Sequence, residues 1–420
     1  MLKAIPYRYR VLALLCSLTT LTYLDRICIS IVGVRIKTAF NLDNEQFGWV
    51  LASFALAYAL FEIPSGILGD RVGPRAVFIR IVLWWSIFTA VTGLVNGLIG
   101  LLIVRFLFGM GEAGTYPNCL IVVSRWFPAN ETGRALTWVG IGSQIGAAVA
   151  PLIIVPLAIA YGWRIPFFVN GAIGIVWALI CYTWFKNFPS EMKHISEKEK
   201  QKIESSCRHK KEQHFISWKF ILKNRTVLAL MLMYFTFQWA NYFFVAWMPV
   251  YLQEGRHVSE DTSKNIIFIL FIAGIAGLIA GGFVSDWLVK KKGLRFGRKL
   301  TGMTGIGMCG LMILLAALIQ QNNIAAACLV GANFSYSFGV MSSYGVCADI
   351  GKNNTGTVTG AMNFAGQTGA FFLAIVFGKI AEVTHSFQYP LLLVAAVLAV
   401  GFLLWFVIDP LRQVEMAENK

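Results

Sequence analysis

Long apolar stretches separated by short polar ones form the dominant pattern of this chain. An α-helix that crosses the roughly 30 Å hydrocarbon core of a bilayer needs about 20 mostly apolar residues. Runs of that kind recur twelve times, so the pattern predicts an all-α membrane protein with twelve transmembrane helices. The predicted spans lie near residues 11–34, 46–68, 77–95, 98–121, 134–158, 164–185, 227–252, 265–288, 300–319, 323–347, 356–379 and 388–408.

The basic residues of the connecting segments predict how these spans are oriented. Lys and Arg are enriched in the loops on the cytoplasmic side of a membrane. Residues 186–225 carry eleven Lys or Arg against five Asp or Glu, and residues 290–299 carry six Lys or Arg and no acid. The turns near 96–97 and 320–323, on the opposite side, carry no charge. We therefore expect both termini and the segment 186–225 to be cytoplasmic.

Composition agrees with a membrane protein and excludes other classes. Hydrophobic residues make up 57% of the chain and charged residues only 14%, against about 25% charged residues in a typical soluble domain. The net charge of +15 is divided among short loops, which fits membrane topology and contact with anionic lipids. It forms no single basic domain, so we expect no nucleic-acid partner.

The charged stretch 186–225 divides the predicted spans into six and six. We therefore expect a six-helix N-terminal half at residues 1–185, a cytoplasmic linker at 186–225 and a six-helix C-terminal half at 226–420. Glu and Lys alternate along the linker at helical spacing, which predicts a partly helical, solvated segment.

The two halves carry matching motifs. In each half a Gly precedes an Asp by four residues, and Arg or Lys residues follow. Gly-rich, Gln-bearing segments also recur at corresponding places, and we expect the glycines of both motifs to allow close helix packing. The matching elements are Gly66 and Asp70 with Gly282 and Asp286, and residues 139–151 with 360–372. Internal repeats of this kind are typical of secondary transporters.

Four ionisable side chains lie inside predicted spans of the first half: Asp25, Arg26, Arg105 and Glu112. A charge held in a bilayer is costly, so it indicates a transport pathway, a proton site or a ligand counter-ion. Arg105 and Glu112 are seven residues apart, which places them on one helix face, roughly 10 Å apart along the axis.

Acid and Arg side chains in one apolar cavity suggest a coupling mechanism. A buried carboxyl can hold a proton near neutral pH, and Arg binds a carboxylate through two parallel hydrogen bonds. If a substrate carboxylate competes with the acid for the Arg, proton binding and anion binding favour each other, which is the linkage that a symporter requires. The alternative is that the four residues form two buried ion pairs that only hold helices together.

Several motifs, in order along most of the chain, resemble those of the major facilitator superfamily and, within it, the anion:cation symporter family. The superfamily motif is G-x-x-x-D-R-x-G-x-R at 66–75. The narrower motifs are YLDR (23–26), YALFEIPSG (58–66), RFLFGMGEAGTYPN (105–118), SRWFP (124–128), GSQIG (142–146), WMPVYL (247–252) and MNFAG (362–366). The family includes proton-coupled bacterial importers of hexonates and hexuronates, and animal carriers of sialic acid, phosphate or glutamate.

The resemblance implies roles for individual residues. Glu112 and Asp25 match proton-coupling acids, and Arg26 matches an Arg implicated in substrate or gating contacts. Arg105 matches an Arg that pairs with an acid or with substrate. The polar positions that line the sugar-acid cavity in the family match Tyr58, Gln144 and Asn363.

Further candidates come from the residues themselves. Gln238 and Tyr242 are polar members of the span near 227–252, and we expect them to face the cavity. That span holds no Lys or Arg, which argues against the organophosphate antiporters, since these use an Arg from each half to hold phosphate. On the cytoplasmic side we expect charged residues to latch helices together and to set the balance between conformations, namely Asp70, Arg71, Arg75 and Asp286.

These observations predict a secondary active transporter, a proton-coupled symporter of a small organic anion such as a sugar acid. By resemblance it is a monomer of the bacterial inner membrane that works by alternating access. One rival is a proton-driven exporter of a metabolite, siderophore or drug, and another is a ligand sensor with a transporter fold. No nucleophile–base pair or metal-ligand spacing is present, so we expect no enzyme, no metal and no cofactor beyond the proton as coupling ion.

Overall fold

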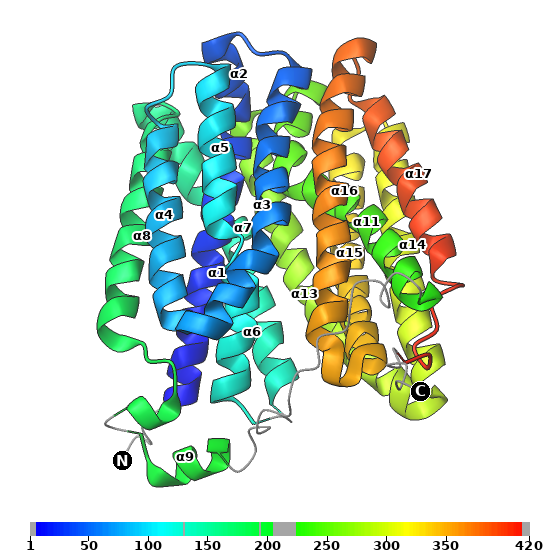
Figure 1. Cartoon of the computed structure of the whole chain (residues 1–420). Helices are drawn as coiled ribbons and strands as arrows, with labels where there is room; N and C mark the ends of the chain where they lie inside the picture. The colour runs from blue at the N-terminus through cyan, green and yellow to red at the C-terminus, as the bar shows by residue number, and fades with distance from the viewer. Residues whose placement is uncertain (1–5, 129–130, 193–194, 205–223, 414–420) are drawn as a thin grey trace. The chain divides into compact units, whose positions relative to one another are not determined.

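A computed structural model describes residues 6–128, 131–192, 195–204 and 224–413 (Figure 1). Regular structure in these residues is helical throughout, without a strand. The earlier helices are α1 (Tyr7–Ile31), α2 (Gly33–Phe40), α3 (Asn44–Val72), α4 (Pro74–Thr92), α5 (Leu98–Glu112), α6 (Thr115–Trp126), α7 (Thr132–Tyr161), α8 (Ile165–Trp184) and α9 (Glu197–Glu204). The later ones are α11 (Arg225–Tyr242), α12 (Met248–Val250), α13 (Glu260–Lys292), α14 (Leu294–Leu318), α15 (Asn322–Gly351), α16 (Thr355–Thr384) and α17 (Gln388–Leu404).

The helical segments confirm a multi-pass membrane protein. Among the described residues, eleven are long and apolar enough to cross a membrane. The twelfth predicted span, near 388–408, is α17, an apolar helix of 17 residues. The fold class predicted from the sequence is therefore confirmed.

The fourth predicted span is confirmed as one membrane-length segment, Leu98–Trp126, but its helix is interrupted between α5 and α6. Helix α5 ends at Glu112 and α6 begins at Thr115, whose hydroxyl donates to the Glu112 carbonyl oxygen at 2.8 Å. Gly114 lies at the break, and Pro117 in the first turn of α6 has no N–H to continue the ladder of α5. The break places Glu112 in the last turn of α5.

The seventh span departs from α-helical geometry on both sides of a proline. Two π-helical stretches, Phe243–Trp247 and Tyr251–Gly255, flank the short α12, which contains Pro249. A proline removes one backbone donor, and wider π turns are a common way to accommodate such a break. The end of this span is therefore widened and redirected at Pro249.

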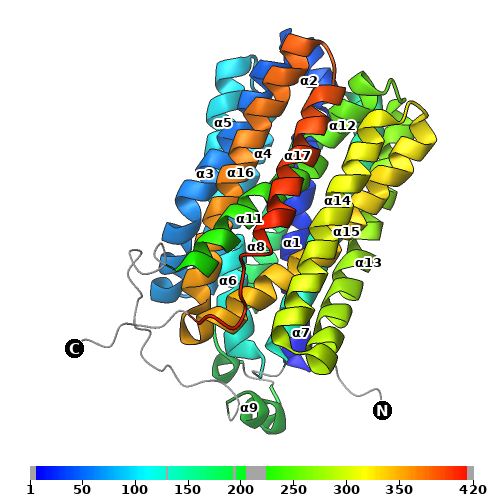
Figure 2. The ribbon, with the colours of Figure 1, turned by 90° about the vertical axis from the view of Figure 1, so that its right-hand side faces the viewer.

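The chain forms two compact units, and the segment Lys37–Ala52 packs with the C-terminal one, although the sequence placed it in the first half. In the first unit α1 packs on α7, and α4 on α8. In the second, the corresponding spans make the same pairs, α11 with α16 and α14 with α17, and Figure 2 shows the helices of this unit. The recurrence of these pairs supports the internal repeat.

Two glycines at matching positions allow the same close approach in each unit. A Cβ atom placed on Gly146 of α7 would lie 2.1 Å from the Thr20 carbonyl oxygen of α1, and one on Gly369 of α16 would lie 2.2 Å from the Phe235 carbonyl oxygen of α11. A side chain at either position would force the two backbones apart.

The close contact expected at Gly282 is absent, because nothing among the described residues lies within 4 Å of a Cβ placed there. The preceding residue, Gly281, makes the contact instead, with a Cβ position 2.1 Å from the Phe338 carbonyl oxygen of α15. One residue turns the side-chain direction by about 100° on a helix, so the motif register alone did not identify the packed glycine.

The beginning of the predicted linker is folded onto the first unit. The Asn187 side chain accepts a hydrogen bond from the Arg75 backbone N–H at 2.9 Å and so caps the start of α4. The Glu199 carboxylate of α9 accepts from the backbone N–H groups of Tyr7 and Arg8, each at 3.1 Å, and caps the start of α1. The partly helical prediction therefore holds for α9, while residues 205–223 lie outside the described part of the chain.

We expect Glu199→Ala to release α9 from the start of α1. The first N–H groups of a helix have no partner within it, and a charged acceptor there is stabilising. Loss of a charge-assisted bond worth about 1.4 kcal/mol corresponds to about tenfold faster hydrogen exchange at Tyr7 and Arg8. Glu197→Ala, at an exposed position on the same helix, is the matched control. Unchanged exchange in Glu199→Ala would show that the cap has no energetic weight.

A buried lysine fixes the segment Lys37–Ala52 within the second unit. The Lys37 ammonium donates to Glu254 at 2.5 Å and to the Asn44 side chain at 2.7 Å. Asn44 begins α3, and its backbone and side-chain N–H groups donate to one Glu382 carboxylate oxygen at 2.9 and 3.0 Å. Charged partners from α16 and from the end of the seventh span therefore hold the start of α3.

We expect Glu254→Ala to destabilise the second unit, because it leaves the Lys37 ammonium buried without its charged partner. The cost is about 3 kcal/mol, near the low end for a broken buried pair, since the Glu254 side chain is 28% exposed. Thermal unfolding of the purified protein measures the loss, and exchanging the two charges in a double variant should restore part of it. Asp261→Ala, in the exposed pair with Lys264, is the control and should change little.

Candidate functional site

The charged residues of α1 and α5 form a buried ion pair between the two helices. Arg26 Nε donates to Glu112 Oε1 at 2.9 Å, and Arg26 Nη2 contacts the same oxygen. Arg26 is 7% exposed and Glu112 is fully buried. The second carboxylate oxygen of Glu112 accepts no hydrogen bond from the described residues. The pair therefore leaves one carboxylate oxygen available for a proton.

Aromatic rings surround the Arg26 guanidinium. Its Cζ atom lies 4.8 Å from the ring centroid of Tyr23 and 5.0 Å from those of Phe54 and Tyr58. A guanidinium is attracted to the faces of aromatic rings, most strongly where water is excluded. The three rings keep the charge in a fixed orientation while leaving its hydrogen-bond donors to an anion. Tyr58 was predicted to contact substrate, and the structure places it beside Arg26.

Arg105 is a second buried arginine whose charge reaches both acids of this site. Its guanidinium stacks over Phe54 at 5.0 Å and over Phe108 at 4.6 Å, and its charge acts on both Asp25 and Glu112. The seven-residue spacing suggested Glu112 as its partner, but the hydrogen-bonded partner of Glu112 is Arg26. Arg105 therefore contributes positive potential to both acids.

Asp25 is adjacent to Arg26 in sequence but points to different neighbours. Its carboxyl is buried and faces Trp85 of α4 and Asn170 of α8. Successive residues on a helix point about 100° apart, so Asp25 points away from Arg26 and from the Glu112 carboxylate that Arg26 holds. Of the two ion pairs in that alternative, the contacts show the one between Arg26 and Glu112, while Asp25 faces Trp85 and Asn170 and is reached by the charge of Arg105.

Further polar residues lie on α6, just after the break, and on α7. The hydroxyls of Tyr116 and Ser143 are hydrogen-bonded to each other, joining α6 to α7. Gln144 is half-buried next to Ser143 on α7. Tyr116 and Ser143 were not predicted from the sequence, and the available signal was that Tyr116 follows the GEAG motif and Ser143 lies within GSQIG.

The second unit carries a cluster of tyrosines and amides. Tyr336 donates to the Gln238 side-chain oxygen at 3.0 Å, joining α15 to α11. Tyr344 donates to the Asn363 side-chain oxygen at 3.4 Å, and its hydroxyl lies 3.1 Å from that of Tyr234. The predicted residues Gln238 and Asn363 thus each accept a hydrogen bond from a tyrosine hydroxyl, in two separate groups, and these tyrosines were not singled out from the sequence.

Tyr242 has a structural contact that the sequence did not indicate. Its hydroxyl donates to the Leu51 backbone carbonyl oxygen at 2.7 Å. The substrate contact predicted for Tyr242 remains a prediction, and in this conformation its hydroxyl proton is used in that bond.

The predicted latch residues of the first unit have different surroundings. The Arg75 guanidinium donates to the Tyr182 carbonyl oxygen at 2.6 Å and so ties α4 to the end of α8. Asp70 and Arg71 are exposed, and Asp70 acts electrostatically on Arg125 of α6. Arg75 thus holds helices together, and a role for any of the three in changing conformation remains a prediction.

The corresponding latch of the second unit centres on an arginine that the sequence analysis missed. Arg298 of α14 pairs with Asp286 at 3.2 Å and with Asp349 of α15 at 3.0 Å, and it donates to the Ser285 hydroxyl at 2.8 Å. Arg298 therefore joins α13, α14 and α15. Its position in the repeated basic motif after Asp286 was the signal that could have identified it.

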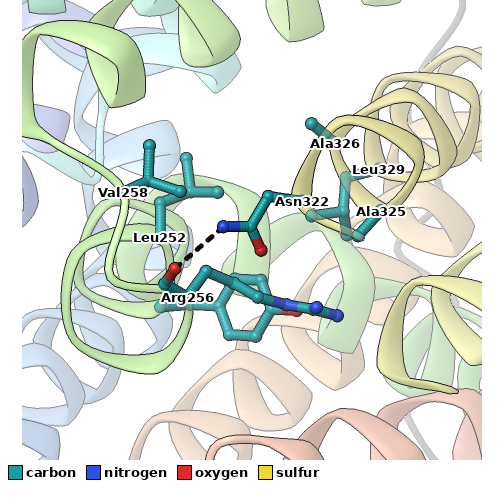
Figure 3. Close-up of a pocket in the computed structure, with 8 residues that line it drawn as sticks. Leu252, Arg256, Val258, Asn322, Ala325, Ala326 and Leu329 are labelled. Carbon is teal, nitrogen blue, oxygen red and sulfur yellow. Dashed lines mark hydrogen bonds between the residues drawn. The ribbon is translucent and has the colours of Figure 1, made fainter. Parts of the chain in front are cut away.

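Figure 3 shows a small hollow in the second unit between the end of the seventh span and α15. Its only charged lining residue, Arg256, donates to the Ile319 carbonyl oxygen at 2.7 Å and to the Tyr251 hydroxyl at 2.7 Å, and Asn322 donates to the Arg256 carbonyl oxygen at 3.1 Å. The guanidinium closes the C-terminal end of α14, where a cation is stabilising. This arrangement explains the hollow as helix capping.

Metal binding finds no support within the described ranges, where no group of three His, Cys, Asp or Glu side chains could hold an ion. The charged site of the first unit instead offers two acids and two arginines in an apolar surrounding. Such a set can exchange protons and bind an anion.

Comparisons with known proteins place this site in context. Residues 15–374 match the family model described as Major Facilitator Superfamily. The chain is 32% identical over 378 residues to a hexuronate transporter of Bacillus subtilis, covering 89% of this chain and 88% of that protein. It is 30% identical over 395 residues to a probable L-galactonate transporter of Escherichia coli, covering 93% and 86%.

A solved structure shares the fold. A bacterial homolog of the human lysosomal transporter Spinster, in an inward-facing and unoccupied conformation, aligns with a TM-score of 0.74 over 96% of this chain and 97% of that one. Its sequence identity is 20%, so the likeness concerns the fold alone.

Proposed function

The chain belongs to the major facilitator superfamily and is a transporter, and we propose that it moves a small organic anion together with protons by alternating access. The similar sequences named for hexuronate and L-galactonate transport support a sugar acid as the anion. The observation that carries the proposal is the buried Arg26–Glu112 pair, in which the guanidinium binds one oxygen of the carboxylate.

Coupling follows from competition for Arg26. A substrate carboxylate that binds the guanidinium replaces Glu112 Oε1 as acceptor, since a planar guanidinium favours a paired carboxylate. Glu112 is then buried without its counter-charge, and a buried carboxylate in that position takes up a proton instead of remaining charged. Proton binding and anion binding thereby strengthen each other, as linkage requires. On release, Glu112 loses the proton and returns to Arg26.

The remaining parts of the proposal concern direction and setting. We propose uptake into a bacterial cell across the inner membrane, with both termini cytoplasmic as the loop charges indicate. Asp25 is proposed as a second proton site. Substrate contacts of Tyr58, Gln144, Gln238 and Asn363 are part of the same proposal. A monomer suffices, because both acids and both arginines come from one chain.

Transport by purified protein in liposomes tests the proposal. A hexuronate, a hexonate and an uncharged hexose are offered outside vesicles whose exterior is acidic. We expect concentrative uptake of at least one acid, its loss when a protonophore collapses the gradient, and no uptake of the hexose. Vesicles without protein, and vesicles with the protein but no gradient, are the controls.

Other results would contradict part of the proposal or favour one of the rival functions. Uptake that is indifferent to the proton gradient would contradict proton coupling. Transport in which the anion and protons cross the membrane in opposite directions would favour the exporter. Saturable binding without flux would favour the ligand sensor. Failure of every carboxylate to bind would remove the organic-anion proposal.

A further inference from the structure

The turn between α13 and α14 carries a run of lysines whose charge is not neutralised. Residues 290–292 are three exposed lysines in the last turn of α13. Among the described residues none of them has an ion-pair partner, because acids near this turn pair with arginines instead. Asp286 pairs with Arg298 and Asp409 with Arg295, each at 3.2 Å. The end of α13 therefore presents a strongly positive surface.

The corresponding turn of the first unit has a similar backbone conformation but is covered by protein. Gly73 between α3 and α4 and Gly293 between α13 and α14 have φ angles of +89° and +88°. A Cβ atom placed on Gly73 would lie 2.7 Å from Asn187 Nδ2, whereas one on Gly293 would meet nothing within 4 Å among the described residues. Arg75, two residues after Gly73, is bonded to the Tyr182 carbonyl oxygen. The cation of the first turn thus serves the protein itself, and the lysines of the second turn do not.

The two helices that meet at this turn pack on each other, as Figure 2 shows, and both present exposed apolar side chains. On α13, Phe283 is 74% exposed and Trp287 is 47% exposed. Together with Lys291 they follow one another at intervals of four residues, so they lie along one helix face. On α14, Phe296 and Leu300 are exposed at the same interval. The exposed surface therefore changes from apolar to charged toward the turn.

Two of the lysines lie over the exposed rings. Lys291 Nζ is 4.5 Å from the ring centroid of Trp287, and Lys292 Nζ is 5.1 Å from that of Phe296. An ammonium group is attracted to the face of an aromatic ring at such distances. The ring occupies one side of each ammonium, and the three N–H donors of a lysine leave others for an anion.

We propose that residues 290–292, together with Trp287 and Phe296, bind the headgroup of an anionic phospholipid. Its phosphate supplies the negative charge and the acceptor oxygens that ammonium groups bind. Clusters of roughly four to eight Lys or Arg at the cytoplasmic end of a membrane helix are typical of anionic-lipid binding, and residues 290–299 contain six. Trp is enriched at the depth of the headgroups. The site is separate from the charged residues of the first unit and does not depend on the proposed transport reaction.

A phospholipid fits this surface better than a soluble anion does. Phe283 and Lys291 are eight residues apart, about 12 Å along the axis of α13. Over that distance the exposed face passes from a phenyl ring through an indole to an ammonium group, in the order in which a phospholipid passes from its acyl chains to its phosphate. Free phosphate would engage the lysines and leave Phe283 and Leu300 without a partner.

Lipid binding to the purified full-length protein in detergent tests the site. Native mass spectrometry gives the dissociation constants of phosphatidylglycerol and of phosphatidylcholine with the same acyl chains. We expect the wild type to bind phosphatidylglycerol more tightly. Each lysine near an anionic surface contributes about fivefold in affinity, so the double variant Lys291→Gln, Lys292→Gln should bind phosphatidylglycerol about 25-fold more weakly. Its affinity for phosphatidylcholine should change little.

Three further variants separate the charges, the rings and the net charge of the protein. Lys198→Gln, Lys200→Gln removes the same charge from α9, where glutamates alternate with lysines, and should keep the affinity for phosphatidylglycerol. Lys291→Arg, Lys292→Arg keeps both charges and should keep most of it. Trp287→Ala should weaken the binding of both lipids, since it removes the apolar part of the contact.

Three results would overturn the proposal. The first is an unchanged affinity for phosphatidylglycerol in Lys291→Gln, Lys292→Gln, and the second is an equal loss in the α9 control, which would show attraction by net charge alone. The third is displacement of phosphatidylglycerol by an equal concentration of inorganic phosphate, which would show a site for the free anion. None of these measurements requires transport, so their failure leaves the proposed function untouched.

Discussion

Glu112→Gln is expected to separate anion transport from the proton gradient. Glutamine keeps the size of the side chain and an acceptor oxygen for Arg26, but it cannot take up a proton near neutral pH. Concentrative uptake should fall to background, whereas exchange of internal for external substrate, which needs no net proton movement, should continue. Uptake and exchange assays on the same proteoliposomes measure the two activities.

The same variant should bind the anion more tightly. In the wild type a substrate carboxylate must displace the charged Glu112 from Arg26, and that competition disappears when residue 112 is neutral. A gain of about 1.4 kcal/mol, close to the value of one charge-assisted hydrogen bond, corresponds to about tenfold tighter binding. Binding isotherms measured from acidic to alkaline pH test this. The wild type should lose affinity as pH rises through the titration of Glu112, and the variant should lose less.

Asp25 provides the control for this prediction. It is a buried acid of the same unit with no ion pair to Arg26. Asp25→Asn should therefore reduce coupling to protons without making anion binding tighter. The double variant Glu112→Gln, Asp25→Asn should bind the anion with almost no dependence on pH. Equal affinity of Glu112→Gln and wild type at alkaline pH would show that Glu112 does not compete with substrate.

The number and class of the spans could be predicted, because the bilayer imposes a length and a composition on every crossing segment. The break at Gly114 was not predicted, because hydropathy averaged over a span does not register a local interruption, although Gly114 and Pro117 were a signal for it. The π-helical turns around Pro249 escaped prediction for the same reason. Hydrophobicity reports burial in lipid, not the local path of the backbone.

The charged residues of the site were identified, but their partners were not. Arg26 and Glu112 are 86 positions apart in sequence, and only the packing of α1 near α5 brings them together. The spacing of seven residues pointed to Arg105, a neighbour on the same helix face. Sequence spacing can describe one helix, whereas an ion pair between helices depends on their relative rotation.

Asn170 and Trp85 were missed for a related reason. An isolated amide or indole in an apolar span is most often an interhelical contact, so neither residue stood out from the sequence. Their significance comes from Asp25, which faces both of them. A polar residue in a membrane helix therefore acquires meaning only when the structure supplies its neighbour.

Arg26→Ala should abolish anion binding, the largest loss expected from any single substitution in this protein. Arg26 is buried beside three aromatic rings and carries the hydrogen-bond donors that hold Glu112 Oε1. Removing one partner of a buried, hydrogen-bonded charge pair costs about 2–5 kcal/mol, which corresponds to a loss of roughly 30-fold to several thousandfold. Direct binding to the purified protein, with thermal unfolding recorded in parallel, measures the effect.

Arg26→Lys and Arg105→Ala distinguish an anion contact from a structural one. Lysine keeps the charge but loses the planar, paired donors, so Arg26→Lys should retain weak binding. The charge of Arg105 acts on both acids, whereas Arg26 donates the hydrogen bonds to Glu112 Oε1. Arg105→Ala should therefore alter the pH dependence of uptake more than the affinity measured at acidic pH. If instead Arg105→Ala abolishes binding while Arg26→Ala preserves it, the anion binds to Arg105, and the coupling must pass through Asp25 instead of Glu112.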